Sequence, residues 1–206
     1  MSPVQRLVDD AKSMGVELTE LDAARLQQLL DELERWNRTY NLTAITKRED
    51  MVTHHLLDSL AIHPELHGTA IADVGTGAGF PGLPLAVLNP ERRFTLIDSA
   101  GKKIRFVSHV AHALGLTNVE GLHTRVESLR PEKPFDTVVT RAFAPLPEML
   151  EKVAALCGPD THVLAMKGKW PREEIAAIPL GWRVMHSRDL VVPGLKESRC
   201  AIVLAR

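Results

Sequence analysis

Apolar residues recur every three or four positions along the first sixty or so residues, which is the period of one face of an α-helix. The pattern predicts three helices. The first ends at Gly15, where a residue tolerant of positive φ is favoured, and the second begins after Thr19, which can cap it together with Asp22. The third runs from about residue 49 to residue 60, and Pro64 stops its continuation. Residues 1–66 are therefore expected to form a helical cap, not an independent domain.

From residue 67 onward, short β-type runs alternate with helical stretches. This alternation is typical of a parallel sheet covered by helices on both faces. Strands are predicted at residues 70–74, 94–97, 119–123, 137–140, 162–166, 183–192 and 200–205, and helices at 83–88, 102–114 and 146–156. Pro193 and Gly194 separate the last two strands by too little chain for a crossover helix, so this pair is expected to be antiparallel. Residues 67–206 are thus predicted to be one α/β domain with a seven-stranded mixed sheet.

The composition is that of an ordinary globular protein, with 206 residues, 45% hydrophobic and 25% charged. These values exclude a disordered chain, a collagen and a coiled-coil rod. No run reaches the ~18 apolar residues of a membrane-spanning helix, and the first residues lack the apolar core of a signal peptide, so a cytoplasmic protein is expected. Cys157 and Cys200 lie far apart, which disfavours both structural zinc and a disulfide framework.

The net charge of −1 hides an asymmetry between the two parts of the chain. Residues 1–66 contain 7 Lys and Arg against 12 Asp and Glu, whereas residues 67–206 contain 18 against 14. A polyanion should therefore meet the second part of the chain, although charge alone is equally compatible with two solvated surfaces.

A glycine-rich segment from Asp73 to Gly82 follows the first predicted strand. Glycines at such a turn let backbone N–H groups approach a ligand without interference from Cβ atoms. Residues 77–82 fit the dinucleotide pattern G-x-G-x-x-G, whereas the register that directly follows the strand is D-x-G-x-G-x-G over residues 73–79. A P-loop is excluded because Leu83 follows Gly82 in place of Lys and Ser or Thr.

Asp98 ends the second predicted strand, where a carboxylate can accept hydrogen bonds from ribose hydroxyls. Such an acid suits NAD as well as S-adenosylmethionine, so it indicates a ribose-bearing cofactor without selecting one. Asp98 could alternatively cap the next helix.

The register D-x-G-x-G-x-G resembles motif I of the class I S-adenosylmethionine-dependent methyltransferases. At closer range the chain is similar to the bacterial small-subunit ribosomal RNA guanine-N7 methyltransferases, once called glucose-inhibited division protein B. The similar blocks are residues 40–45, 55–59, 73–86, 98–103, 126–127, 140–142 and 166–168, and the likeness covers about residues 36–206. It implies a Rossmann-like methyltransferase fold, S-adenosylmethionine as cofactor, and 16S ribosomal RNA or the small ribosomal subunit as partner.

The resemblance also implies roles for individual residues. The cofactor-binding residues would be Asp73, Gly75, Gly77, Gly79, Phe80, Asp98, Val126, Glu127 and Arg141. Among them the glycine turn and Phe80 would line the methionine and adenosine pocket, Asp98 would bind the ribose, and Val126 and Glu127 would contact the adenine region. Without the resemblance, Phe80 is equally a core residue, Glu127 an exposed carboxylate and Arg141 a partner of a nearby acid.

The segment after the fourth predicted strand carries no group suited to accept a proton. Methylation of an exocyclic amine places such a group there in an Asp/Asn-Pro-Pro-aromatic run, but residues 140–145 read TRAFAP. Methylation of a pyrimidine carbon needs an activated cysteine, and Cys157 and Cys200 fall in structural positions. Guanine N7 has an exposed lone pair and no proton, so alignment at about 3–3.5 Å from the methyl group suffices. We therefore expect catalysis by positioning, without a general base and with Arg141 as the single candidate catalytic residue.

Basic residues near the cofactor site are expected to bind RNA phosphates, although each alone is more often a solvated surface charge. They are Lys102, Lys103, Arg105, Lys167, Lys169, Arg172, Lys196 and Arg199. Trp36 and Tyr40 could stack on a base, but core packing is favoured for Trp36.

His54, His55 and Asp58 fall close together on a predicted helix, but no further ligand lies at a useful spacing, so no metal is expected. Given the resemblance, hydrogen bonds from His55, Asp58 and Asn41 are expected to link the cap to the cofactor domain.

Two other functions stay open on the residues. An NAD-dependent oxidoreductase would use residues 77–82 and Asp98, but it lacks an evident acid or base pair for hydride transfer. A noncatalytic RNA-binding assembly factor could retain the cofactor pocket. The favoured interpretation is a monomeric methyltransferase.

Overall fold

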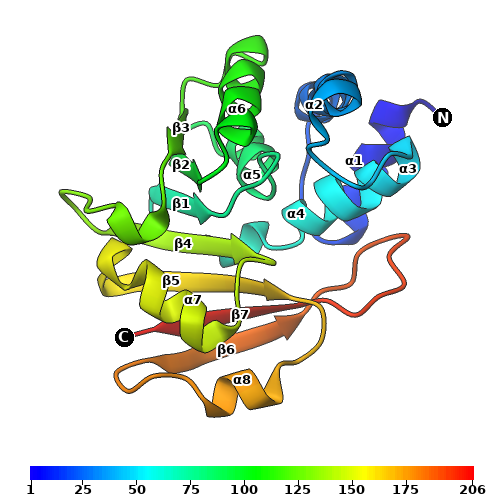
Figure 1. The fold of residues 1–206 in the computed structure, drawn as a ribbon. Coiled ribbons are helices and arrows are strands. Elements are labelled where there is room, and N and C mark those ends of the chain that lie inside the picture. The colour runs from blue at the N-terminus through cyan, green and yellow to red at the C-terminus, as the bar shows by residue number, and fades with distance from the viewer.

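The computed structural model describes residues 1–206 and contains one seven-stranded sheet (Figure 1). Its strands are β1 (Ala70–Val74), β2 (Arg93–Asp98), β3 (Val119–His123), β4 (Phe135–Arg141), β5 (Cys157–Lys167), β6 (Arg183–Asp189) and β7 (Cys200–Ala205). Their order is β3-β2-β1-β4-β5-β7-β6. β1 to β5 are parallel, and β7 lies between β5 and β6, antiparallel to both. The predicted mixed sheet with an antiparallel closing pair is confirmed.

Two strand boundaries, the start of β5 and the end of β6, differ from the prediction by more than two residues. β5 begins at Cys157, well before residue 162, because its first residues pair with the start of β4 across a register shift. Cys157 therefore opens a strand and does not end a helix. β6 ends at Asp189 and not at residue 192, because Leu190 and Val192 leave the sheet and enter the apolar core beneath the cap.

Helices cover both faces of the sheet. α5 (Gly82–Leu88) and α6 (Gly101–Ala113) cover one face, and α7 (Leu146–Val153) with its 3-10 extension Ala154–Leu156 covers the other (Figure 1). A 3-10 turn (Val126–Ser128) follows β3, and α8 (Arg172–Ala176) follows β5. The carboxyl ends of the parallel strands thus lie at one edge, between the two helical layers.

The cap consists of α1 (Pro3–Ser13), α2 (Glu20–Tyr40), α3 (Arg48–Met51), a π-helix (Val52–Leu57), α4 (Asp58–Leu60) and a 3-10 turn (His63–Glu65). Thr19 and Asp22 form the predicted capping box, and Gly15 has φ +77°. None of the helices combines the length and apolar character that crossing a bilayer requires.

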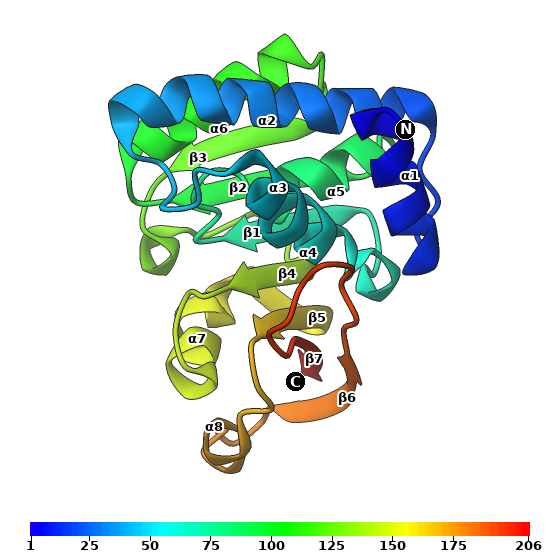
Figure 2. The ribbon, with the colours of Figure 1, turned by 90° about the vertical axis from the view of Figure 1, so that its right-hand side faces the viewer.

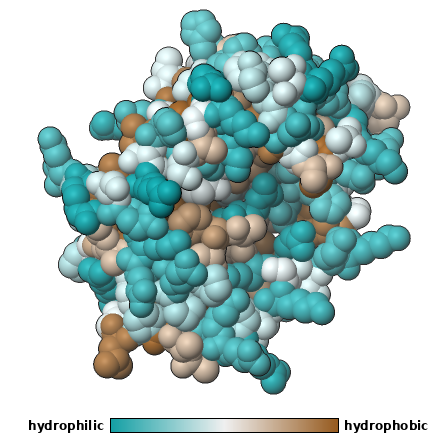
Figure 3. Space-filling model, viewed as in Figure 1, coloured by the Kyte–Doolittle hydropathy of each residue, from teal (hydrophilic) through white to brown (hydrophobic).

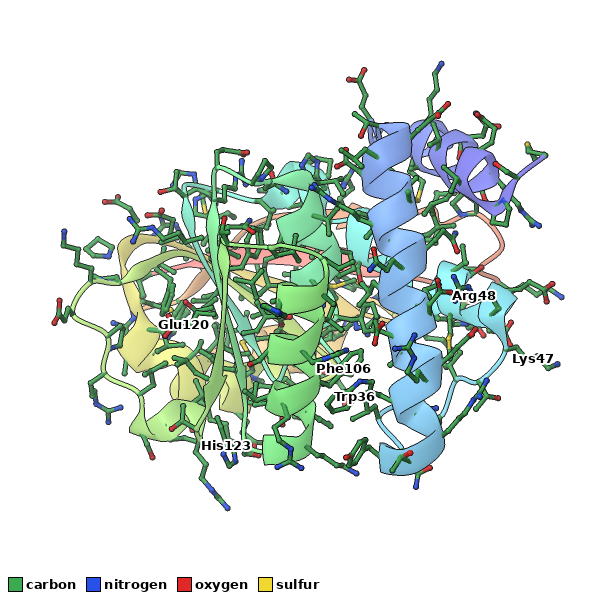
Figure 4. The ribbon with its side chains drawn as sticks, turned by 90° about the horizontal axis from the view of Figure 1, so that it is seen from above. Trp36, Lys47, Arg48, Phe106, Glu120 and His123 are labelled. Carbon is green, nitrogen blue, oxygen red and sulfur yellow. The ribbon has the colours of Figure 1, made fainter.

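The cap lies against the α5 and α6 layer, with α2 running alongside α6 (Figure 2). The Trp36 ring of α2 packs 5.6 Å from the Phe106 ring of α6 (Figure 4). His109 Nε2 of α6 lies 2.8 Å from Glu32 Oε2 of α2. One cluster of 37 buried apolar residues runs through the cap, α5, α6 and the sheet. Trp36 therefore packs against the core, whereas Tyr40 keeps 39% of its surface exposed.

The third cap helix is formed as predicted, but its middle is a π-helix. Because of this wider turn, the N–H of Asp58 bonds to the carbonyl of Thr53 and not to that of His54. The His54 carbonyl instead accepts a hydrogen bond from Arg141 Nη1 at 2.8 Å. The π-helix thus gives the end of β4 an attachment point on the cap, in keeping with the frequent occurrence of such turns at functional sites.

Candidate active site

A hollow of about 370 Å³ opens at the carboxyl ends of β1 and β2, beside the segments that follow β3 and β4. Four of the predicted cofactor residues line it: Gly75, Asp98, Val126 and Glu127. Its volume lies in the range of ~300–1,000 Å³ that is usual for small-molecule sites. The outer surface is largely hydrophilic and is hollowed near the middle of the face drawn in Figure 3.

The glycine turn after β1 has a backbone that other residues rarely adopt. Gly75 has φ +70° and Gly77 has φ +61°. A Cβ atom on Gly75 would come within 2.6 Å of the Phe143 ring, so the site also lacks room for a side chain there. The turn is therefore built from glycine for both conformational and steric reasons.

Asp98 closes this turn and faces the hollow at the same time. Its Oδ2 accepts a hydrogen bond from Gly77 N at 2.9 Å, and its Oδ1 accepts one from Ala100 N at 2.8 Å. Lys103 Nζ lies 3.9 Å from Oδ2. The carboxylate is 9% exposed, which leaves it accessible from the hollow while its position is fixed. Because α6 begins at Gly101 without a side-chain cap, Asp98 is not the N-cap of that helix.

Asp73 is buried behind the glycine turn, which it stabilises by hydrogen bonds, and it does not line the hollow. Its Oδ2 accepts hydrogen bonds from Thr76 Oγ1 at 2.6 Å and from Gly82 N at 2.8 Å, whereas its Oδ1 is buried without a partner. Burial raises the pKa of this carboxyl to about 6, against the opposing effect of the two hydrogen bonds. Asp73 thus has a structural role in the turn, and its predicted contact with a ligand stays a prediction.

The remaining predicted cofactor residues also lie outside the hollow. Gly77 and Gly79 belong to the turn but do not line the hollow, and Phe80 is 2% exposed and stacked on His55. Arg141 forms an ion pair with Asp58 of the cap, with Nη1 3.2 Å from Oδ2. In this structure Phe80 is a core residue and Arg141 is paired with a nearby acid, as the residues alone also allowed, and their contact with a cofactor stays a prediction.

The sequence of this chain is similar to those of known proteins over almost its whole length. A model of the family described as rRNA small subunit methyltransferase G matches residues 22–203. The chain belongs to this family. It is 44% identical to the ribosomal RNA small subunit methyltransferase G of Ectopseudomonas mendocina, with 100% of this chain and 99% of the relative covered. It is 47% identical to that of Pseudomonas paraeruginosa, with 97% and 94% covered.

Solved structures of more distant proteins share the fold. A SAM-dependent methyltransferase from Aquifex aeolicus is 21% identical, with a TM-score of 0.58 over 81% of this chain and 97% of that one. Magnesium protoporphyrin IX methyltransferase from Synechocystis, solved with bound SAM, is 16% identical, with a TM-score of 0.60 over 92% and 98%. These likenesses confirm the class I methyltransferase fold, and family membership disfavours both the oxidoreductase and the noncatalytic alternative.

In this member of the methyltransferase G family, eight further residues line the hollow that were not predicted as site residues: Val74, Ile97, Ser99, Thr124, Arg125, Ala142, Phe143 and Lys152. Lys152 reaches it from α7, with Nζ 3.6 Å from Glu127 Oε1 and 5.5 Å from the centre of the Phe143 ring. In the sequence, Lys152 appears only as the helical partner of Glu148, to which it also bonds at 2.7 Å. The one available signal was that Phe143 closely follows the end of β4.

The basic residues predicted to bind RNA fall into two groups. Four are held by the protein itself: Lys102 donates to the carbonyl of Tyr40 at 2.8 Å, Lys103 lies beside Asp98 in the hollow, Lys167 bonds to Glu174 at 2.7 Å, and Arg199 pairs with Asp58. Arg105, Lys169, Arg172 and Lys196 have no ion-pair partner. Lys167 in particular is not free for RNA in this conformation, because α8 supplies its counterion.

Of the three predicted hydrogen-bonded links between the cap and the cofactor domain, only that of Asp58 is formed, because His55 contacts the domain by ring stacking and not by a hydrogen bond. Asp58 binds Arg141 and Arg199, and His55 stacks on Phe80 while its Nε2 lies 3.0 Å from Thr43 Oγ1. Asn41 makes no such link. It ends α2 in the left-handed conformation with φ 47°, a position that asparagine tolerates well. No group of three or more His, Cys, Asp or Glu side chains is arranged to hold a metal ion.

Proposed function

We propose that this protein transfers a methyl group from S-adenosylmethionine to N7 of a guanine in 16S ribosomal RNA. The observation that carries the proposal is the match to the rRNA small subunit methyltransferase G family over residues 22–203. The hollow beside the glycine turn supports it, because the residues of this chain that line it fit a nucleoside cofactor.

The fit rests on Gly75 and Asp98. The left-handed turn at Gly75 presents backbone without a side chain to the hollow, and the fixed carboxylate of Asp98 can accept hydrogen bonds from ribose hydroxyls. Val126 and Glu127 line the same hollow and are suited to the adenine region. When bound there, S-adenosylmethionine supplies a sulfonium-activated methyl group.

The arrangement suits a reaction that needs no proton acceptor. The carboxylate of Asp98 already accepts two backbone hydrogen bonds, and that of Glu127 is paired with Lys152 at 3.6 Å. Both groups are assigned to the cofactor here, Asp98 to the ribose and Glu127 to the adenine region, so neither is left to act as a general base toward the guanine. Attack by guanine N7 releases no proton, so the chain needs only to align the base and exclude water.

The cap and the methyltransferase domain are further proposed to act as one unit, residues 1–66 with residues 67–206. Their shared apolar cluster of 37 residues supports this. Because the proposed substrate is ribosomal RNA, we propose that the protein acts in the cytoplasm. One chain contains the whole hollow, so we also propose that the protein is a monomer.

Calorimetric titration with S-adenosylmethionine and with NAD tests the cofactor, and a transfer assay tests the reaction. We expect binding of the first ligand and none of the second. Incubation with labelled S-adenosylmethionine and 16S ribosomal RNA or small ribosomal subunits, followed by nucleoside digestion and mass spectrometry, should yield 7-methylguanosine. Methylation at another atom would overturn the chemistry proposed here, and binding of NAD alone would overturn the cofactor.

A further inference from the structure

Asp58 of the cap joins two arginines that come from distant parts of the chain. Its Oδ2 lies 3.2 Å from Nη1 of Arg141 at the end of β4, and its Oδ1 lies 3.2 Å from Nε of Arg199, just before β7. Only 4% of the Asp58 side chain is exposed. One buried carboxylate therefore holds two guanidinium groups beside each other.

Backbone carbonyls fix the two guanidinium groups further. Arg141 Nη1 also donates to the carbonyl of His54 at 2.8 Å, and Arg199 Nη1 donates to the carbonyl of Ser198 at 3.0 Å. Each arginine side chain nevertheless keeps 22% of its surface exposed. Nη2 of each has no partner in the protein and is not among the buried unpaired atoms. The protein thus orders both side chains and leaves donors of each open to solvent.

The pair lies at the ligand-binding edge of the sheet but outside the hollow. Arg141 pairs with Met166 near the carboxyl end of β5, and Cys200, next to Arg199, pairs with Lys167. The guanidinium carbon of Arg141 is 5.8 Å from the centre of the Phe80 ring, which places the pair beside the glycine turn. Because none of Asp58, Arg141 and Arg199 lines the hollow, the open donors are not directed at a cofactor there.

We propose that Arg141 and Arg199, held by Asp58, form a binding site for a backbone phosphate of the RNA strand that enters the active site. Two positive charges against one negative charge leave a net positive site, and guanidinium groups match phosphate oxygens in geometry. Ordering both side chains before binding reduces the entropy that is lost on association. Arg141 then acts on RNA and not on the cofactor, and Asp58 is a positioning residue. The inference rests on the proposed function.

The test measures binding to 16S ribosomal RNA over a range of salt concentrations. We expect Arg141→Ala and Arg199→Ala each to weaken binding by about tenfold or more, as loss of a charged hydrogen bond does. Each should also reduce the salt slope by ~0.7, the value for one phosphate contact on a single strand. Affinity for S-adenosylmethionine should stay that of the wild type. Lys133→Ala is the matched control, because it removes one exposed positive charge from the segment before β4, at the opposite edge of the sheet.

Asp58→Asn separates positioning from net charge. The substitution makes the protein more positive, so a purely electrostatic effect would strengthen RNA binding. Loss of positioning weakens RNA binding instead, and this is the expected result. Arg199→Lys keeps the positive charge but loses the planar guanidinium group that can donate two hydrogen bonds to one phosphate. It should therefore retain the salt slope while RNA affinity falls. This variant serves as the test if an alanine variant does not fold.

The outcomes distinguish this site from the function itself. If the wild type methylates 16S ribosomal RNA but the folded Arg141 and Arg199 variants bind it with unchanged affinity and slope, the phosphate site is overturned and the function stands. If folded Asp58→Asn binds RNA more tightly than the wild type, the positioning role is overturned. If the wild type transfers no methyl group to any small-subunit RNA, the proposed function itself fails.

Discussion

The imidazole of His55 lies flat against the ring of Phe80, with the ring centres 4.5 Å apart and an angle of 13° between the planes. His55 belongs to the π-helix of the cap and Phe80 to the glycine turn, so this contact joins the cap to the cofactor turn. Nδ1 of His55 is buried without a hydrogen-bond partner. Burial, together with the nearby charge of Arg141, lowers the pKa of His55 from 6.5 to about 4.

We predict that His55 makes the protein less stable as the pH falls from 6.5 to about 4. In this window the unfolded chain protonates His55, whereas the folded chain keeps it neutral, so protons favour the unfolded state. This destabilisation reaches its full value of about 3 kcal/mol near pH 4, and it vanishes above the pKa that His55 has in the unfolded chain. Denaturant unfolding at pH 7 and at pH 4.5 measures it.

His55→Gln should lose this pH dependence, and His112→Gln, at an exposed position of α6, should keep it. Asp73 has the opposite effect, because burial raises its pKa to about 6 and protonation then favours the folded state. The effect of Asp73 is the same in the wild type, in His55→Gln and in His112→Gln, so it cancels when their pH dependences are compared. An unchanged pH dependence in folded His55→Gln would assign the effect to other groups.

Substitution of Gly75 should remove cofactor binding and also destabilise the fold. Gly75→Ala places a Cβ at φ +70° and 2.6 Å from the Phe143 ring, so both the backbone and the ring must move. The backbone term alone costs about 1–2 kcal/mol. We expect no measurable calorimetric binding of S-adenosylmethionine and a lower free energy of unfolding.

Gly115→Ala is the matched control for this change. Gly115 has φ +65°, but a Cβ there meets nothing within 4 Å, so it carries the backbone cost without the clash. It should bind S-adenosylmethionine like the wild type. Wild-type affinity in Gly75→Ala would mean that the glycine turn does not contact the cofactor.

The fold could be predicted from the sequence because its signals are local. Hydrophobic periods of two and 3.6 residues mark the strands and helices, and Gly75, Asp98, Val126 and Glu127 each closely follow or end a strand. In a parallel sheet all such positions share one edge, so their meeting in the hollow follows from topology.

The remaining site residues depend on long-range packing. Asp58 meets Arg141 across 83 positions and Arg199 across 141, and no local pattern specifies either pair. Lys152 reaches the hollow only because α7 turns its last residues toward Glu127. Likewise, Lys167 is predicted to bind RNA because it lies at the carboxyl end of a strand, but in the structure it forms an ion pair with Glu174 of α8.

Asp98→Asn should weaken binding of S-adenosylmethionine by about tenfold to a hundredfold, the loss expected for a charged hydrogen bond. An amide has one acceptor oxygen, whereas Asp98 uses two, for Gly77 N and Ala100 N, and it also faces the hollow. Glu127→Gln should have a smaller effect, because the Glu127 side chain is 48% exposed and its one ion-pair partner, Lys152 Nζ, lies 3.6 Å away. Calorimetry on both variants measures the difference. Equal losses would indicate that Asp98 has no special role toward the ribose.

Replacement of both cysteines should leave methyl transfer intact. Burial raises the pKa of Cys157 to about 12 and also raises the pKa of Cys200, so neither forms a thiolate at neutral pH, and neither lines the hollow. We expect Cys157→Ala and Cys200→Ala to keep the rate of transfer to 16S ribosomal RNA within about twofold, with a small loss of stability from the vacated core volume. A thiol reagent should label the wild type only after unfolding. Loss of transfer in a folded variant with normal cofactor affinity would imply a covalent step, which attack by guanine N7 does not require.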